Sequence, residues 1–157
     1  MPTRNHFARL TSSPKHHPAD PALAASLLGI DEKTLLSGEE GGVRIVSVGT
    51  LLWHLFESLV TQSVRVYAQA AEATVKHFRT MGGRNEVDLI VERNDQKVVA
   101  IEVKLKRSVD EDDVKKLLWL KDKMNNDLIE MLLINTGPEA YRRKDGVAVV
   151  PASLLGA

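Results

Sequence analysis

The segment from residue 86 to residue 105 constrains the fold more than any other part of the sequence. Residues 86–91 and 98–105 are rich in β-branched side chains, and the polar residues 94–96 lie between them. This pattern predicts two strands joined by a tight hairpin. A helical pattern follows, and then the nearly all-apolar run 128–134, which is typical of a strand buried on both faces. We therefore expect strand, crossover helix and parallel strand to follow the hairpin.

The rest of the chain predicts a mixed α/β sheet. Apolar residues recur at helical spacing over 50–70, and residues 74–80 alternate with the period of a strand. Ser108 is expected to cap the next helix, with Glu111 three residues on. Residues 147–150 are expected to form a last strand. The order is helix, three strands, helix, strand and strand, in a mixed sheet of about four to five strands with helices on both sides.

A length of 157 residues predicts one domain with a short appendage. Asp20 followed by Pro21 favours the start of a short helix, and Gly29 favours its end. We expect residues 1–30 to form an N-terminal arm with this helix, and residues 31–157 to form the domain. The apolar stretch 43–48 is expected to be a strand or packed loop.

Composition narrows the function classes. The chain has 21 Lys plus Arg, 21 Asp plus Glu and no Cys, so its formal net charge is zero and thiolate zinc sites and thiol nucleophiles are excluded. No apolar run approaches the ~20 residues of a membrane span. The first residues also lack the apolar stretch of about 7–15 residues found in a signal peptide. We therefore expect a cytoplasmic protein without a membrane partner.

Three charged residues on the predicted hairpin carry the chemical signal. A turn centred on residue 95 places Asp88 opposite Glu102, with their side chains on the same face. Lys104 is two residues beyond Glu102 and shares that face. A shift of one residue in the pairing register of the hairpin would place Asp88 on the face opposite to Glu102 and Lys104.

Two neighbouring carboxylates repel each other unless a cation lies between them. Mg²⁺ typically takes one or two protein carboxylates and leaves positions for water and phosphate oxygens. Lys104 beside such a pair is suited to orient a water molecule or to steady negative charge on phosphate. This chemistry is attack of water on a phosphodiester. The alternative is an ordinary solvated sheet face with a cross-strand Asp–Lys pair.

The ordered set Glu57, Asp88 and Glu102-Val-Lys104, on helix, strand and strand, resembles the PD-(D/E)XK nuclease superfamily. More closely, residues 83–122 resemble the nuclease-like C-terminal domain of a family of prokaryotic AAA+ ATPases. The stretch before it, residues 12–30, resembles the segment that precedes the core in those proteins. The resemblance covers about residues 12–155.

The resemblance implies a restriction-endonuclease-like core. By position, Asp88 and Glu102 would hold Mg²⁺ or Mn²⁺, Lys104 would serve catalysis, and Glu57 would contribute from the helix, often through water. The chain departs from the superfamily in having Val87, where proline is frequent, before Asp88. It also contains no G-x-x-x-x-G-K-[ST] phosphate loop, so we expect no ATP hydrolysis by this chain.

Four basic residues near the predicted site are candidates for contacts with nucleic acid. Arg84 lies in a glycine-containing turn, Lys106 and Arg107 follow the third strand, and Lys115 lies in the next helix. The alternatives are a solvated turn arginine and lysines that protect a sheet edge.

Two functions from different classes remain open. One is a Mg²⁺-dependent nuclease-like domain that hydrolyses DNA phosphodiester bonds and is coupled to an AAA+ ATPase in cis or in trans. The other is a catalytically inactive module of the same fold that binds nucleic acid or protein or forms a homodimer. The intact Asp88, Glu102 and Lys104 favour the first function. The balanced charge favours the second, because a free nuclease generally has a basic groove.

Overall fold

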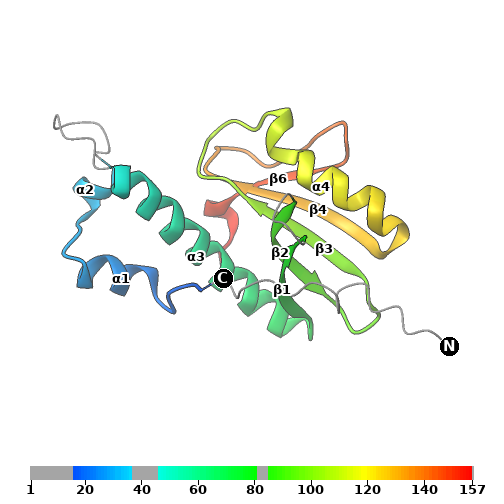
Figure 1. Ribbon diagram of the computed structural model, residues 1–157, viewed down its shortest axis with the longest axis horizontal. Helices are drawn as coiled ribbons and strands as arrows, with labels where there is room; N and C mark the ends of the chain where they lie inside the picture. The colour runs from blue at the N-terminus through cyan, green and yellow to red at the C-terminus, as the bar shows by residue number, and fades with distance from the viewer. Residues whose placement is uncertain (1–15, 37–45, 81–84, 157) are drawn as a thin grey trace.

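The computed structural model describes residues 16–36, 46–80 and 85–156, with only the backbone of residues 46–49. The secondary-structure elements are arranged around one mixed sheet (Figure 1). The α-helices are α1 (Pro21–Leu27), α2 (Glu32–Leu36), α3 (Val46–Ala70) and α4 (Glu111–Met124). The strands are β1 (Thr74–Arg79), β2 (Glu86–Glu92), β3 (Val98–Val103), β4 (Leu128–Asn135), β5 (Tyr141–Arg142) and β6 (Ala148–Pro151). Two 3₁₀ turns, η1 (Asn125–Asp127) and η2 (Ala152–Leu154), complete the described elements.

The sheet has six strands in the order β1-β2-β3-β4-β6-β5. The expectation of four to five strands is therefore wrong. Strands β1, β2 and β3 form an antiparallel meander, and β4 and β6 continue the sheet in parallel with β3. The strand missing from the prediction is β5, which pairs antiparallel with β6 through Tyr141 and Arg142. Two residues are too few for a recognisable alternation, which explains why the sequence pattern does not indicate this strand.

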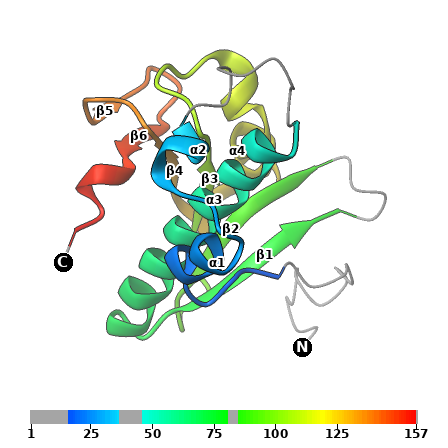
Figure 2. The ribbon, with the colours of Figure 1, turned by 90° about the vertical axis from the view of Figure 1, so that its left-hand side faces the viewer.

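Helices cover both faces of the sheet, as the sequence predicts (Figures 1 and 2). On one face, α4 packs Val114, Leu117 and Leu120 into a cluster with residues of all the longer strands. On the other face, α3 packs Val60 and Val64 against Leu89, Ile101, Val103 and Ile134. Alternate residues of β3 therefore lie in different halves of the core.

The start of α1 is as predicted and the start of α4 is not. Asp20 caps α1, because its carboxylate accepts a hydrogen bond from the Leu23 amide, and Pro21 occupies the first turn. Asp110, rather than Ser108, caps α4 by accepting from the amides of Asp112 and Asp113. The Asp113 side chain accepts in return from the Asp110 amide. Ser108-Glu111 and Asp110-Asp113 have the same spacing, so the sequence alone does not separate the two caps.

The N-terminal elements differ from the sequence expectation in two places. Residues 32–36 form α2, which the sequence analysis did not anticipate. Residues 46–48, within the stretch expected to be a strand or packed loop, belong to α3, and residues 43–45 lie outside the described residues. Within the described ranges, none of the helices combines the length and apolarity needed to cross a bilayer.

The loop after β3 is held against the end of β4. The Thr136 amide donates to the Lys106 carbonyl at 3.1 Å, and the Asn135 side-chain amide donates to the Arg107 carbonyl at 3.0 Å. Gly137 fits tightly here, because a Cβ atom at this position would lie 2.8 Å from the Arg107 carbonyl oxygen. The two chain segments approach this closely because residue 137 has no side chain.

We expect Gly137→Ala to lower the free energy of unfolding by about 1–3 kcal/mol, the typical cost of overpacking. The added methyl group meets a backbone oxygen, which cannot rotate away as a flexible side chain would. Urea unfolding followed by circular dichroism measures the change. Gly156→Ala is the matched control, since its Cβ atom would meet nothing within 4 Å. Equal stability of the two variants would contradict the close approach.

Candidate functional site

A β-bulge in β2 shapes the candidate site. Lys76 pairs with Ile90 and Phe78 pairs with Val87, so Asp88 and Leu89 of β2 together lie opposite the single residue His77 of β1. The His77 Nδ1 atom lies 3.2 Å from the Asp88 carbonyl oxygen. A bulge bends its strand and re-aims the side chains at that point. Asp88 therefore lies where β2 departs from regular pairing.

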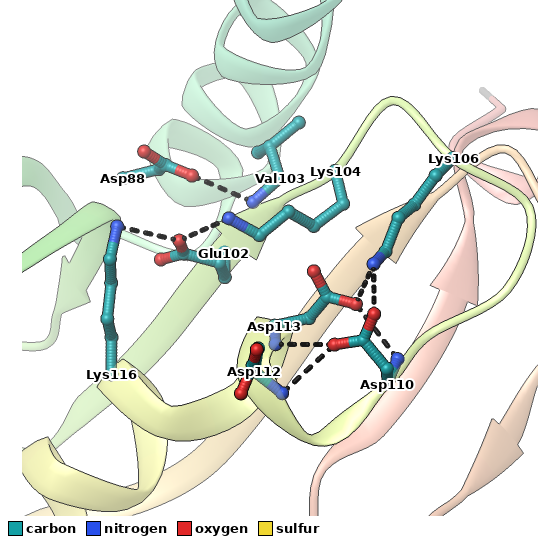
Figure 3. A network of polar contacts seen from close by, with 9 residues as sticks. All are labelled: Asp88, Glu102, Val103, Lys104, Lys106, Asp110, Asp112, Asp113 and Lys116. Atoms are coloured by element: carbon teal, nitrogen blue, oxygen red, sulfur yellow. Dashed lines mark hydrogen bonds and ion pairs between the residues drawn. The ribbon is translucent and has the colours of Figure 1, made fainter.

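At this point the Asp88 carboxylate, rather than a backbone carbonyl of β2, accepts the hydrogen bond from β3. The recorded pairs of β2 with β3 run from Glu92–Val98 to Leu89–Ile101, which is the register that the sequence predicts. Beyond them, the Val103 amide donates to Asp88 Oδ2 at 2.9 Å (Figure 3). A side-chain oxygen thus satisfies a backbone amide that would otherwise need a partner in β2. This hydrogen bond fixes the orientation of the carboxylate.

Glu102 is the most deeply buried charged residue of the site, with 0% of its surface exposed. Its Oε1 atom accepts from Lys104 Nζ at 2.9 Å and from Lys116 Nζ at 3.3 Å. The two lysines reach Glu102 from opposite sides, Lys104 from the end of β3 and Lys116 from α4 (Figure 3). Among the described residues, no hydrogen-bond partner meets Glu102 Oε2. One oxygen of this buried carboxylate therefore makes no hydrogen bond within the described part of the chain.

The charges of the site act on one another. Burial raises the pKa of Glu102 above its ordinary value, the Asp88 carboxylate raises it further, and Lys104 and Lys116 oppose the rise. Burial by itself would lower the pKa of Lys104, but the Glu102 carboxylate outweighs burial and raises that pKa. The geometry therefore keeps Lys104 protonated and makes the charged form of Glu102 costly.

Asp88, Glu102 and Lys104 of the predicted set lie together, and the fourth predicted residue, Glu57, is a buried residue of α3. Glu57 is 1% exposed and lies on the same stripe of α3 as Val60 and Val64, which pack on the sheet face opposite to α4. Within the described residues there is no group of three or more Asp, Glu or His side chains able to hold a metal ion. The carboxylates that the site offers directly are thus the pair Asp88 and Glu102. A contribution of Glu57 through water stays a prediction.

The four candidate nucleic-acid residues have different surroundings. Lys106 forms ion pairs with Asp110 and Asp113, and Lys115 forms one with Asp112 at 2.5 Å. Arg107 is exposed and, within the described part of the chain, has no ion pair. Arg84 lies outside the described residues. Acidic side chains at the start of α4 therefore neutralise two of the four candidates.

Sequence reasoning missed Lys116. Its neighbours Leu117 and Leu120 mark the core-facing side of α4, and Asp113 lies one helical turn before it. The helical spacing alone indicates that Asp113 and Lys116 border the apolar stripe. The sequence does not reveal that the crossover to β4 brings this border over Glu102.

The fold and the site together define a class: a mixed α/β domain with a buried carboxylate pair and two lysines beside a bulged strand. The chain belongs to the family described as Domain of unknown function (DUF4143), whose profile matches residues 54–155. This domain is often found at the C-terminus of AAA ATPases. No curated protein and no solved structure matches the chain.

We expect Glu102→Gln to raise the melting temperature at neutral pH. A carboxyl group with a pKa above its unfolded value destabilises the fold once the pH exceeds the unfolded pKa, about 4.3 for Glu. Burial and Asp88 place Glu102 in that class. The advantage of the variant should shrink as the pH falls towards and below about 4.3, because Glu102 then becomes protonated in the unfolded state as well as in the folded state. Differential scanning calorimetry between pH 4 and 8 measures it, since about 1 kcal/mol shifts the melting temperature by about 2–4 °C at this size.

Glu130→Gln is the matched control. Its hydrogen bond with Arg142 lowers the pKa of Glu130, so this ionised carboxylate adds stability at neutral pH. The control variant should therefore lose a little stability where Glu102→Gln gains it. A loss of stability in Glu102→Gln at neutral pH would contradict the assigned balance of burial and ion pairing.

Proposed function

We propose that this domain hydrolyses DNA phosphodiester bonds with the help of Mg²⁺ or Mn²⁺, and that Asp88, Glu102 and Lys104 form its active site. One observation carries the proposal: Glu102, fully buried beside Asp88, has an oxygen that no described residue meets with a hydrogen bond. Burial of two neighbouring carboxyl groups is costly for a fold and is typical of sites that receive a cation. The resemblance to PD-(D/E)XK nucleases supports the same assignment.

The residues fit a divalent cation. Mg²⁺ prefers oxygen ligands and commonly uses only one or two carboxylates, with water and substrate phosphate completing its coordination. Asp88 and Glu102 would hold it, and Glu57 would contribute through water. A bound Mg²⁺ would supply a more acidic water molecule and neutralise charge on phosphate.

The protein's own groups would position the reactants. The hydrogen bond from the Val103 amide, at 2.9 Å, keeps the Asp88 carboxylate in one orientation. Lys104 is held next to Glu102 as a protonated ammonium, which is suited to binding a phosphate oxygen or orienting the attacking water. Asp88 lies in β2, and Lys104 directly follows β3, where its backbone amide donates to the Ile134 carbonyl of β4, so the sheet holds both groups.

The partners would be DNA and an AAA ATPase module. The occurrence of this domain family at the C-terminus of AAA ATPases supports an ATPase that acts in cis or in trans. Of the predicted basic residues that the structure describes, Arg107 is exposed in the loop that begins at Lys104 and has no acidic partner there, so it is the candidate for a DNA phosphate. A homodimer and a cytoplasmic location remain predictions.

A second function is favoured by a different observation. Glu102 Oε1 is already bound by Lys104 and Lys116, and Lys106 and Lys115 are paired with aspartates. Lysines that are already paired with carboxylates are less available to a phosphodiester substrate, which favours a domain that uses the fold to bind a partner without turnover. The two functions differ in metal binding and in cleavage.

Metal binding is the first test. We expect wild-type protein to bind Mn²⁺ or Mg²⁺ in titration calorimetry and Asp88→Asn to lose most of that binding. The asparagine oxygen can still accept from the Val103 amide, so the variant keeps the local hydrogen bond and loses the charge. Glu130→Gln removes a carboxylate of β4 that pairs with Arg142 and not with the lysines of the site, so this variant should bind like wild type. Absence of binding by wild type would rule out the metal-dependent reaction.

Cleavage is the second test. We expect nicking of supercoiled plasmid in Mg²⁺ or Mn²⁺, and a decrease in rate of about 10²–10³-fold in Lys104→Met, the typical effect of removing one charge-stabilising group. Lys97→Met removes an exposed lysine that pairs with Asp127 and should leave the rate unchanged. Metal binding without nicking in wild type, tested with an AAA ATPase partner present as well, would favour the binding module.

A further inference from the structure

Lys116 is the one lysine of α4 that is directed at the buried carboxylates. Its Nζ lies 3.3 Å from Glu102 Oε1, the same atom that Lys104 contacts. The next lysine towards the N-terminus, Lys115, points elsewhere and pairs with Asp112. Consecutive helix positions do not share a face, which explains the different directions. The Lys116 side chain remains 40% exposed, so its ammonium borders both the buried site and solvent.

The charges of the site are balanced without any ligand. Asp88 and Glu102 supply two carboxyl groups, and Lys104 and Lys116 supply two amino groups around them (Figure 3). A divalent cation at the carboxylates adds two positive charges to this balance. It also takes Glu102 away from the two ammonium groups, which then need another anion.

We propose that Lys116 is an anion-binding residue of the site, which holds Glu102 when the site contains no cation and contacts a phosphate group of DNA when a divalent cation takes Glu102. This inference rests on the proposed function, because it requires a cation at Asp88 and Glu102. It adds a residue outside the predicted set and a coupling between two ligands. Each ligand favours the arrangement that the other needs, so cation and phosphate bind with positive cooperativity.

Lys116 is better suited to this exchange than the other nearby lysines. Lys106 is held by Asp110 and Asp113, both close to it in sequence. Lys104 is less exposed, at 26% against 40% for Lys116, and the Asp88 and Asp113 charges also act on it. For Lys116, the described contact is with Glu102 alone, and a flexible four-carbon side chain on a helix can turn from carboxylate to phosphate without moving the backbone.

The test compares Lys116→Gln with Lys97→Gln, a lysine of similar exposure (37% against 40%) whose Nζ also lies 3.3 Å from a carboxylate oxygen, that of Asp127. Mn²⁺ binding is measured by calorimetry without DNA, and a short fluorescein-labelled DNA duplex is titrated with protein in Ca²⁺ and in EDTA. Removing a competing ammonium should tighten Mn²⁺ binding in Lys116→Gln by roughly three- to tenfold, and should weaken DNA binding in Ca²⁺ by a similar factor. Lys97→Gln should match wild type in both Mn²⁺ and DNA binding. Lys116→Arg, which keeps the charge, should restore DNA binding.

The outcomes separate this inference from the proposed function. Wild type that binds Mn²⁺ and nicks DNA, with Lys116→Gln and Lys97→Gln behaving alike, would overturn the role of Lys116 and leave the proposed function in place. Weaker Mn²⁺ binding in Lys116→Gln would also overturn it, because a competitor cannot help the cation to bind. Wild type that binds no divalent cation would overturn both. Thermal melting of each variant confirms that it is folded.

Discussion

The hydrogen bond between the Val103 amide and the Asp88 carboxylate joins two strands at the point where their ladder ends. The bulge in β2 makes this contact possible, because two residues there lie opposite one residue of β1. Without the carboxylate, a buried amide of β3 would lose its partner, at a cost of about 1–3 kcal/mol. The same contact holds Asp88 beside Glu102. Strand pairing and the chemistry of the site therefore depend on one side chain.

The hairpin and its register could be predicted from the sequence, and the bulge could not. The strand-forming segments 86–91 and 98–105 and the short turn between them fix which residues of β2 and β3 face each other, and the pair Leu89–Ile101 confirms that register. The bulge depends on the pairing of β1 with β2. Residues 80–85 separate these strands, and a connection of this length does not fix the register of their pairing. The cap of α4 could not be predicted either, because two cap patterns of the same spacing overlap there. The structure has Asp110 as the cap, and Ser108 was expected. Lys116 was missed because its place over Glu102 depends on how α4 crosses the sheet.

Acidic residues dominate the start of α4 and shape the electrostatics around the site. Glu111, Asp112 and Asp113 occupy the first turn, where they are favourable next to the positive end of the helix dipole. The same residues bind Lys106 and Lys115. The acidic first turn thus stabilises the start of α4 and also neutralises lysines that would otherwise form a basic surface beside the site.

The exchange rate of the Val103 amide hydrogen can serve as a probe of the site. Its hydrogen is held by a side chain, whereas the Lys104 amide next to it donates to the Ile134 carbonyl within the parallel part of the sheet. Any ligand that draws the Asp88 carboxylate away would release the first hydrogen and leave the second in place. The exchange rates of these two neighbouring amides with deuterium therefore report separately on the state of the site and on the integrity of the sheet.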